Sequence, residues 1–103
     1  MKVAIYARTS TELQSTASQI ELCREYAMEQ GWTITGIYDD PGISEDTKER
    51  DGLKLFATEC MKYDILMITG ADRLFQDPAL TEKFLNDLGN PFIQIVIVKQ
   101  LTK

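Results

Sequence analysis

Four short runs of apolar and β-favouring residues alternate with segments of helical periodicity, and this alternation is the strongest constraint on the fold. The runs lie at residues 3–7, 32–38, 63–69 and 92–98. Each has the length of a strand, and the first is apolar enough to be buried on both faces. Strands that alternate with helices are typical of α/β proteins with a mainly parallel sheet. We therefore expect a three-layer α/β fold in which helices flank a mainly parallel sheet of four to five strands.

Start and stop signals in the sequence delimit three helices. Thr16 and Gln19 fit a T-x-x-Q capping box, and Gly31 is a typical C′ residue, so the first helix is expected between them. The second helix is expected over about residues 51–62. The third is expected over residues 77–89, because this segment opens with an aspartate N-cap followed by proline and stops at a glycine.

The composition is that of one ordinary domain in a reducing compartment. The chain has 103 residues, of which 44% are hydrophobic, and it contains no histidine. No apolar run is long enough to span a bilayer, and the first residues do not resemble a secretory signal. Cys23 and Cys60 lie far apart among apolar neighbours, so we expect buried thiols rather than a disulfide or a zinc site. A cytoplasmic protein without a membrane partner fits these features best.

Three of the four arginines fall where a parallel sheet would bring them together. Arg8 follows the first run, Arg50 precedes the second helix and Arg73 follows the third run, whereas Arg24 is expected on a helix surface. The carboxyl ends of parallel strands share one edge, where α/β proteins bind their ligands. Arginine binds phosphate oxygens bidentately, so the sequence predicts a phosphate site at this edge. Surface salt bridges with the acidic segment 39–49 are the structural alternative.

Hydroxyl groups accompany the first of these arginines. Arg8 is followed by Thr9, Ser10 and Thr11, so one guanidinium stands beside three hydroxyls at the end of the first expected strand. A cation next to a hydroxyl can hold a phosphate and attack it, although a strand followed by a polar loop explains these residues equally well. The net charge of −5 argues against a free-standing nucleic-acid binder but does not exclude local phosphate chemistry.

Three blocks of this sequence resemble, in order and in register, the catalytic domain of the serine recombinase (resolvase/invertase) family. They are Y-A-R-T-S-T at residues 6–11 with Gln14 and Gln19, D-x-G-x-S at residues 40–44 followed by R-D-G-L at residues 50–53, and D-R-L at residues 72–74. A single block such as D-R-L is a weak signal, but three at suitable spacing are specific. The resemblance implies a resolvase-like catalytic domain over residues 1–103, and it favours a bacterial or phage origin.

The resemblance also implies an activity and a role for each residue. A serine of that family attacks a DNA phosphodiester and forms a 5′-phosphoserine link, after which strands are exchanged and rejoined without metal, ATP or another cofactor. The corresponding residues here are Ser10 as nucleophile, Arg8, Arg50 and Arg73 as the phosphate clamp, Asp72 as an orienting or proton-handling group, and Gln14, Gln19 and Ser44 as supporting residues. The capping box gives Gln19 a purely structural alternative, and Thr9 and Thr11 are rival hydroxyls.

The chain departs from the family pattern in two ways. Gln76 stands where the third block usually carries a further arginine, and Ala71 replaces a larger apolar residue. The long dimerisation helix and the C-terminal DNA-binding region of the family are also absent from this chain. We therefore expect double-stranded DNA to be bound mostly through regions outside it, and a homodimer to homotetramer for the full-length protein. A catalytically weakened remnant that acts as an interaction module is the alternative.

A flavodoxin-like signalling or nucleotide-binding domain is a third interpretation of the same α/β pattern. A phosphate-receiving signalling domain needs acids at the end of its first strand, where this chain has Arg8 and Ser10. A G-x-x-x-x-G-K phosphate loop does not occur in the sequence either. The sequence thus favours the recombinase interpretation.

Overall fold

The computed structural model describes residues 1–9, 15–42, 50–70, 73–75 and 77–99. Strands and helices alternate through these residues as the sequence predicts. In chain order the elements are β1 (Lys2–Arg8), α1 (Ala17–Gln30), β2 (Thr33–Asp40), α2 (Asp51–Glu59), the 3₁₀ turn η1 (Cys60–Lys62), β3 (Ile65–Ile68), α3 (Pro78–Asp87) and β4 (Gln94–Ile97). Within the described ranges, no helix is long and apolar enough to cross a membrane.

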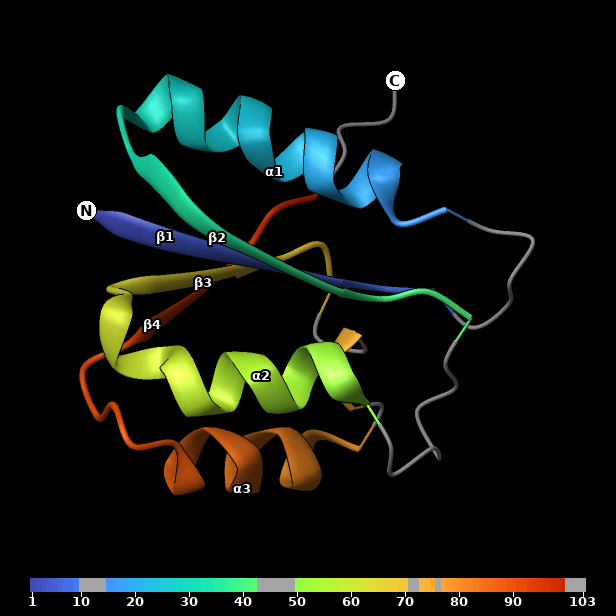
Figure 1. The fold of residues 1–103 in the computed structure, drawn as a ribbon, viewed down its shortest axis with the longest axis vertical. Coiled ribbons are helices and arrows are strands. Elements are labelled where there is room, and N and C mark those ends of the chain that lie inside the picture. The colour runs from blue at the N-terminus through green and yellow to red at the C-terminus, as the bar shows by residue number, and fades with distance from the viewer. Residues whose placement is uncertain (10–14, 43–49, 71–72, 76, 100–103) are drawn as a thin grey trace.

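The described strands form one four-stranded parallel sheet in the order β2-β1-β3-β4. Helix α1 covers one face of the sheet, and α2 and α3 lie on the other, which gives the three layers that were expected (Figure 1). Because every strand runs in the same direction, the carboxyl ends of all four strands point to one edge. The expected α/β class and parallel sheet are therefore confirmed.

The core consists of two clusters, one on each face of the sheet. Side chains of β1 alternate between them, and all five residues of the first apolar run are completely buried. Val3 and Ile5 pack with Cys23 of α1, whereas Ala4 and Tyr6 belong to the cluster beneath α2. Burial raises the pKa of Cys23 to about 11, so its thiol stays neutral at physiological pH. Cys60 is also buried and free, which confirms that both cysteines are buried thiols.

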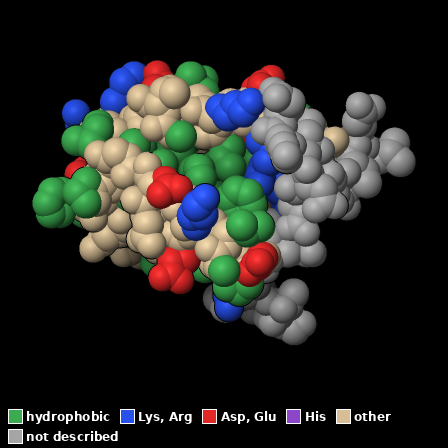
Figure 2. All heavy atoms as spheres, turned by 90° about the horizontal axis from the view of Figure 1, so that it is seen from below, with side chains coloured by type: hydrophobic (Ala, Val, Ile, Leu, Met, Phe, Trp, Pro, Cys, Tyr) green, Lys and Arg blue, Asp and Glu red, His purple; other side chains and the backbone are tan. Residues whose placement is uncertain are grey.

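Helix α3 is packed less deeply against the sheet than α1 and α2 are. None of its residues is fully buried, and Leu80 keeps 49% of its surface exposed. Its main aromatic contact joins Phe84 to Phe75, with ring centroids 5.9 Å apart. Figure 2 views the molecule from the α3 side and shows apolar side chains interspersed with acidic and basic ones. The described part of this face is thus a mixed surface rather than a basic one.

The structure differs from the sequence predictions at two element ends. Strand β2 runs on to Asp40, because Asp39 and Asp40 continue the parallel pairing opposite Ala7 and Arg8. The expected capping box is wrong: the Thr16 side chain makes no cap hydrogen bond, and its Oγ1 donates instead to Asp39 Oδ2 at 2.8 Å. A tertiary contact with the end of β2 has replaced the local one. The C-terminal signal is confirmed, since Gly31 has φ +73° and its N–H caps the last turn of α1.

Candidate active site

Three arginines from distant parts of the chain meet at the carboxyl edge of the sheet. Arg8 ends β1, Arg50 directly precedes α2, and Arg73 follows β3. Arg8 Nε donates to Arg73 O at 3.3 Å, and Arg73 Nη1 donates back to Arg8 O at 3.2 Å. Arg50 Nη2 donates to Arg73 O as well. The predicted convergence is confirmed, and Arg24 is exposed on α1 as expected.

Arg50 is the most enclosed member of this cluster, with only 3% of its surface exposed. Its guanidinium carbon lies 5.6 Å from the ring centre of Tyr6 and 5.1 Å from that of Phe75, so aromatic rings flank the charge. Nη1 donates to Leu74 O, and Nη2 donates to Tyr6 Oη at 3.0 Å. Among the described residues, the ion pair that occurs joins Lys62 to Glu59, away from this cluster. Within those residues, the Arg50 guanidinium therefore has no direct carboxylate partner.

Asp40 holds the start of α2 and reaches Arg50 indirectly. Its Oδ1 accepts from Gly52 N at 2.8 Å and its Oδ2 from Leu53 N at 3.1 Å, so it supplies the N-terminal cap that Arg50 cannot provide. Tyr6 Oη donates to Asp40 Oδ2 at 2.7 Å. Burial, and then this hydrogen bond to the carboxylate, raise the pKa of Tyr6 far above its usual value. The phenol therefore remains neutral and bridges Asp40 to Arg50.

The close approach of α2 to β2 requires a glycine at position 52. A Cβ at this position would lie 2.5 Å from Asp39 O and 2.9 Å from Asp39 C, and both atoms belong to strand backbone. We expect Gly52→Ala to lower the free energy of unfolding by about 2 kcal/mol, because overpacking outweighs the helix propensity gained from alanine. Urea denaturation of the purified chain measures the effect.

Gly89 provides the matched control for this substitution. A Cβ built on Gly89 meets nothing within 4 Å, so Gly89→Ala is expected to change stability by less than about 0.5 kcal/mol. If the two variants unfold at the same urea concentration, the close contact between α2 and β2 does not limit stability.

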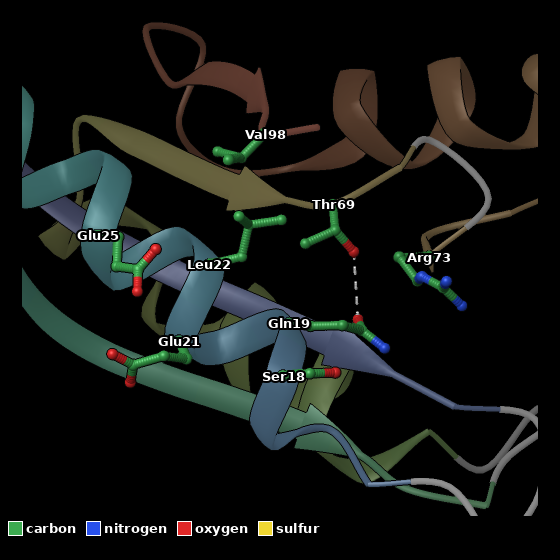
Figure 3. Close-up of a pocket in the computed structure, with 8 residues that line it drawn as sticks. All are labelled: Ser18, Gln19, Glu21, Leu22, Glu25, Thr69, Arg73 and Val98. Atoms are coloured by element: carbon green, nitrogen blue, oxygen red, sulfur yellow. Dashed lines mark hydrogen bonds between the residues drawn. The ribbon is translucent and has the colours of Figure 1, made fainter. Parts of the chain in front are cut away.

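Gln19 fixes the end of β1 from the first turn of α1. Its Oε1 accepts from Arg8 N at 3.2 Å, and its Nε2 donates to Arg8 O at 2.9 Å. Thr69 Oγ1, from the segment after β3, donates to the same Oε1 at 3.4 Å (Figure 3). The structure thus contradicts the capping-box interpretation of Gln19, and its role as a supporting residue of the site stays a prediction.

The Thr9 hydroxyl connects the end of β1 to the residues that follow β2. Thr9 is 4% exposed, and its Oγ1 accepts from Gly42 N at 3.0 Å. Its own N–H donates to Asp40 O at 3.4 Å. This engagement makes Thr9 a poor candidate for a nucleophile. The other predicted site residues lie outside the described part of the chain, and their roles stay predictions: Ser10, Gln14, Ser44, Asp72 and Gln76.

In the part of the chain that the structure describes, two open pockets border the arginine cluster. One, of about 460 Å³, lies between α1 and the ends of β3 and β4 (Figure 3). The other, of about 570 Å³, lies beside the end of β1. Both are lined by Ser18, Gln19 and Arg73. A ligand in either pocket would therefore contact Arg73.

Two buried guanidinium donors in the described structure have no hydrogen-bond partner. They are Nε of Arg50 and Nε of Arg73. Because an unpaired buried donor is costly, such groups are expected where a ligand completes the hydrogen bonding. Cationic N–H donors call for an anion with several oxygens, such as a phosphate. No group of three or more His, Cys, Asp or Glu side chains suited to a metal occurs among the residues described.

Sequence reasoning did not give Tyr6 a role, and it placed Asp40 only within a block. One signal was available for Tyr6: a hydroxyl on a strand buried on both faces needs a polar partner. The cap formed by Asp40 had no such signal, since the carboxylate is 12 and 13 residues from the amides it binds.

Comparison with known proteins assigns a family to this chain. Residues 3–103 match the sequence family described as "Resolvase, N terminal domain". No protein with a curated description matches the chain at the sequence level.

Solved structures extend the comparison to three dimensions. The C-terminal catalytic domain of ISC1926 TnpA, an IS607-like serine recombinase, is 29% identical with a TM-score of 0.82, covering 99% of this chain and 72% of that one. The N-terminal catalytic domain of TP901-1 integrase is 26% identical with a TM-score of 0.82, and the match covers 94% of this chain and 76% of that one. A resolvase family site-specific recombinase from Streptococcus pneumoniae is 18% identical with a TM-score of 0.78 and shares the fold. The match covers 95% of this chain and 72% of that one. The chain therefore belongs to the resolvase family of serine recombinases and corresponds to its N-terminal catalytic domain.

Proposed function

We propose that this chain catalyses DNA strand exchange as the catalytic domain of a site-specific recombinase. The observation that carries the proposal is the convergence of Arg8, Arg50 and Arg73 at the carboxyl edge of the sheet, with two of their Nε donors unpartnered. Clustered guanidinium groups stabilise the charge that develops on a phosphoryl group under attack. Family membership and Ser10, two residues after Arg8 in the sequence, supply the reaction class.

In the proposed reaction, Ser10 Oγ attacks the phosphorus atom of a DNA phosphodiester. The Oγ–P bond forms as the bond from phosphorus to the 3′ oxygen breaks, and the proton lost by Ser10 is balanced by the one that the 3′ oxygen gains. Asp72 handles a proton or orients an arginine in this step. The covalent 5′-phosphoserine conserves the energy of the phosphodiester, so the reverse attack by a new 3′-hydroxyl rejoins the strands without ATP.

The proposed reaction needs two kinds of partner, DNA and further copies of the protein. With a net charge of −5 and a mixed surface on the α3 side (Figure 2), the domain is a weak DNA binder by itself. We propose that double-stranded DNA is held mostly by regions outside this domain. Exchange of strands between two sites further calls for a homo-oligomer, dimer to tetramer, of the full-length protein.

Covalent trapping tests the proposal directly. The chain is fused to a sequence-specific DNA-binding domain and incubated with DNA that carries the matching site and a nick that prevents religation. We expect a protein–DNA adduct on a denaturing gel, with loss of the adduct in Ser10→Ala and its retention in Thr11→Ala. An adduct that persists in Ser10→Ala would show that another residue is the nucleophile.

The departure at Gln76 favours a second candidate function, an interaction module that pairs with a full-length recombinase. In that case the wild-type fusion forms no adduct, and the arginine variant of position 76 forms one. If neither forms an adduct while the protein is folded and bound to DNA, the catalytic proposal is wrong.

A further inference from the structure

The Tyr6 hydroxyl lies between a carboxylate and a guanidinium at the edge of the arginine cluster. The residue is completely buried on β1, yet its Oη lies within hydrogen-bond distance of two charged groups. A phenol has one proton to donate, and a carboxylate can only accept. Tyr6 therefore donates to Asp40 and accepts from Arg50, and the direction of both bonds is fixed.

Asp40 is held rigidly on the far side of this bridge. It accepts two backbone N–H groups at the start of α2 in addition to the Tyr6 hydroxyl. The orientation of the phenol is thus tied to the end of β2 and to the first turn of α2, two elements that pack directly on one another.

Arg50 lies on the near side and links the bridge to the segment after β3. Its two terminal nitrogens donate to the carbonyls of Arg73 and Leu74 and to Tyr6 Oη, and Nε has no partner in the described structure. A direct ion pair with Asp40 would neutralise the guanidinium. The interposed phenol fixes its orientation and leaves the charge available to an anion.

We propose that Tyr6 is a positioning residue for the recombinase site. Its hydroxyl orients Arg50, and through Arg50 it fixes the carbonyls of Arg73 and Leu74, so that the Arg73 guanidinium is aligned for the scissile phosphate. This inference rests on the proposed function for its effect on rate, but the positioning of Arg50 is independent of it.

The substitution Tyr6→Phe tests the proposal, because it keeps the ring against Arg50 and removes only the hydroxyl. Tyr38→Phe is the matched control: its hydroxyl is also buried and bonded, to Glu59 Oε1 at 2.7 Å and to Tyr63, but its partners lie outside the arginine cluster. Both variants are expected to lose stability to a similar extent. Only Tyr6→Phe should slow single-turnover adduct formation, by roughly 10- to 100-fold at saturating DNA, as loss of a hydrogen bond to a charged group implies.

A second measurement does not depend on activity. In nitrogen-15 NMR spectra, the Nε–H signal of Arg50 should exchange slowly with water in the wild type and in Tyr38→Phe, and rapidly in Tyr6→Phe. Unchanged exchange in Tyr6→Phe, or a rate loss no greater than that of Tyr38→Phe, overturns the proposal. If the wild-type fusion forms no adduct, the proposed function fails, and the exchange measurement alone decides whether Tyr6 positions Arg50.

Discussion

Gln76→Arg is expected to raise the rate of covalent adduct formation by about 30- to 1000-fold. The resolvase pattern places an arginine at this position, and an amide can hydrogen-bond a phosphate but brings no charge. One charged contact in a phosphate clamp contributes on the order of 2–4 kcal/mol to transition-state stabilisation, which corresponds to this range of rates. Single-turnover kinetics of the fusion protein on the nicked site measure the difference.

Gln76→Met is the control for this experiment, since it keeps the length of the side chain and removes its polar end. We expect it to react no faster than the wild type. A gain in Gln76→Arg alone supports the view that the natural chain has weakened chemistry. If wild type and Gln76→Arg react at the same rate, the clamp formed by Arg8, Arg50 and Arg73 is complete without a fourth arginine.

Arg73→Ala is expected to lower the same rate by about 100- to 1000-fold. Arg73 lines both pockets beside the site, its Nε lacks a partner in the described part of the chain, and its Nη1 holds the end of β1 through Arg8 O. Arg73→Lys should recover only part of the loss, because an ammonium group cannot bond a phosphate and Arg8 O in the planar geometry of a guanidinium.

Two comparisons make this second prediction decisive. Arg24→Ala removes the same charge from the exposed surface of α1, and it should leave the rate unchanged within about twofold. Urea denaturation should show that Arg73→Ala is folded. Full activity in folded Arg73→Ala would exclude this residue from the phosphate clamp.

The order of strands and helices could be predicted from the sequence because each element carries its own local signal. The run that became β1 is apolar throughout, and the Gly31 cap of α1 and the Asp77 cap of α3 have the geometry that their residue types favour, with Asp77 Oδ1 accepting from Ala79 N at 2.9 Å. The convergence of the arginines was predictable as well, since it follows from the shared direction of parallel strands.

The contacts that complete the site could not be predicted, because they join residues that are distant in sequence. Gln19 had a plausible local partner in Thr16, but its amide binds the Arg8 backbone, and Thr16 binds Asp39. Asp40 resembled a loop acid until strand pairing extended β2 to include it. For Gln19 and Thr16, a tertiary hydrogen bond replaced the local one that the sequence pattern favoured, and for Asp40 the sequence pattern offered no partner.

The reciprocal bonds between Arg8 and Arg73 also bear on when the chain becomes reactive. They join residues 65 positions apart, and α1, β2 and α2 lie between the paired strands β1 and β3 in the sequence. Parallel sheets with such distant contacts fold slowly, since loop closure precedes the contacts that stabilise them. A newly synthesised or partly unfolded chain would hold Ser10 without its clamp. For the proposed recombinase, folding itself would therefore act as a safeguard, because the capacity to cut DNA would arise only when the whole sheet is in place.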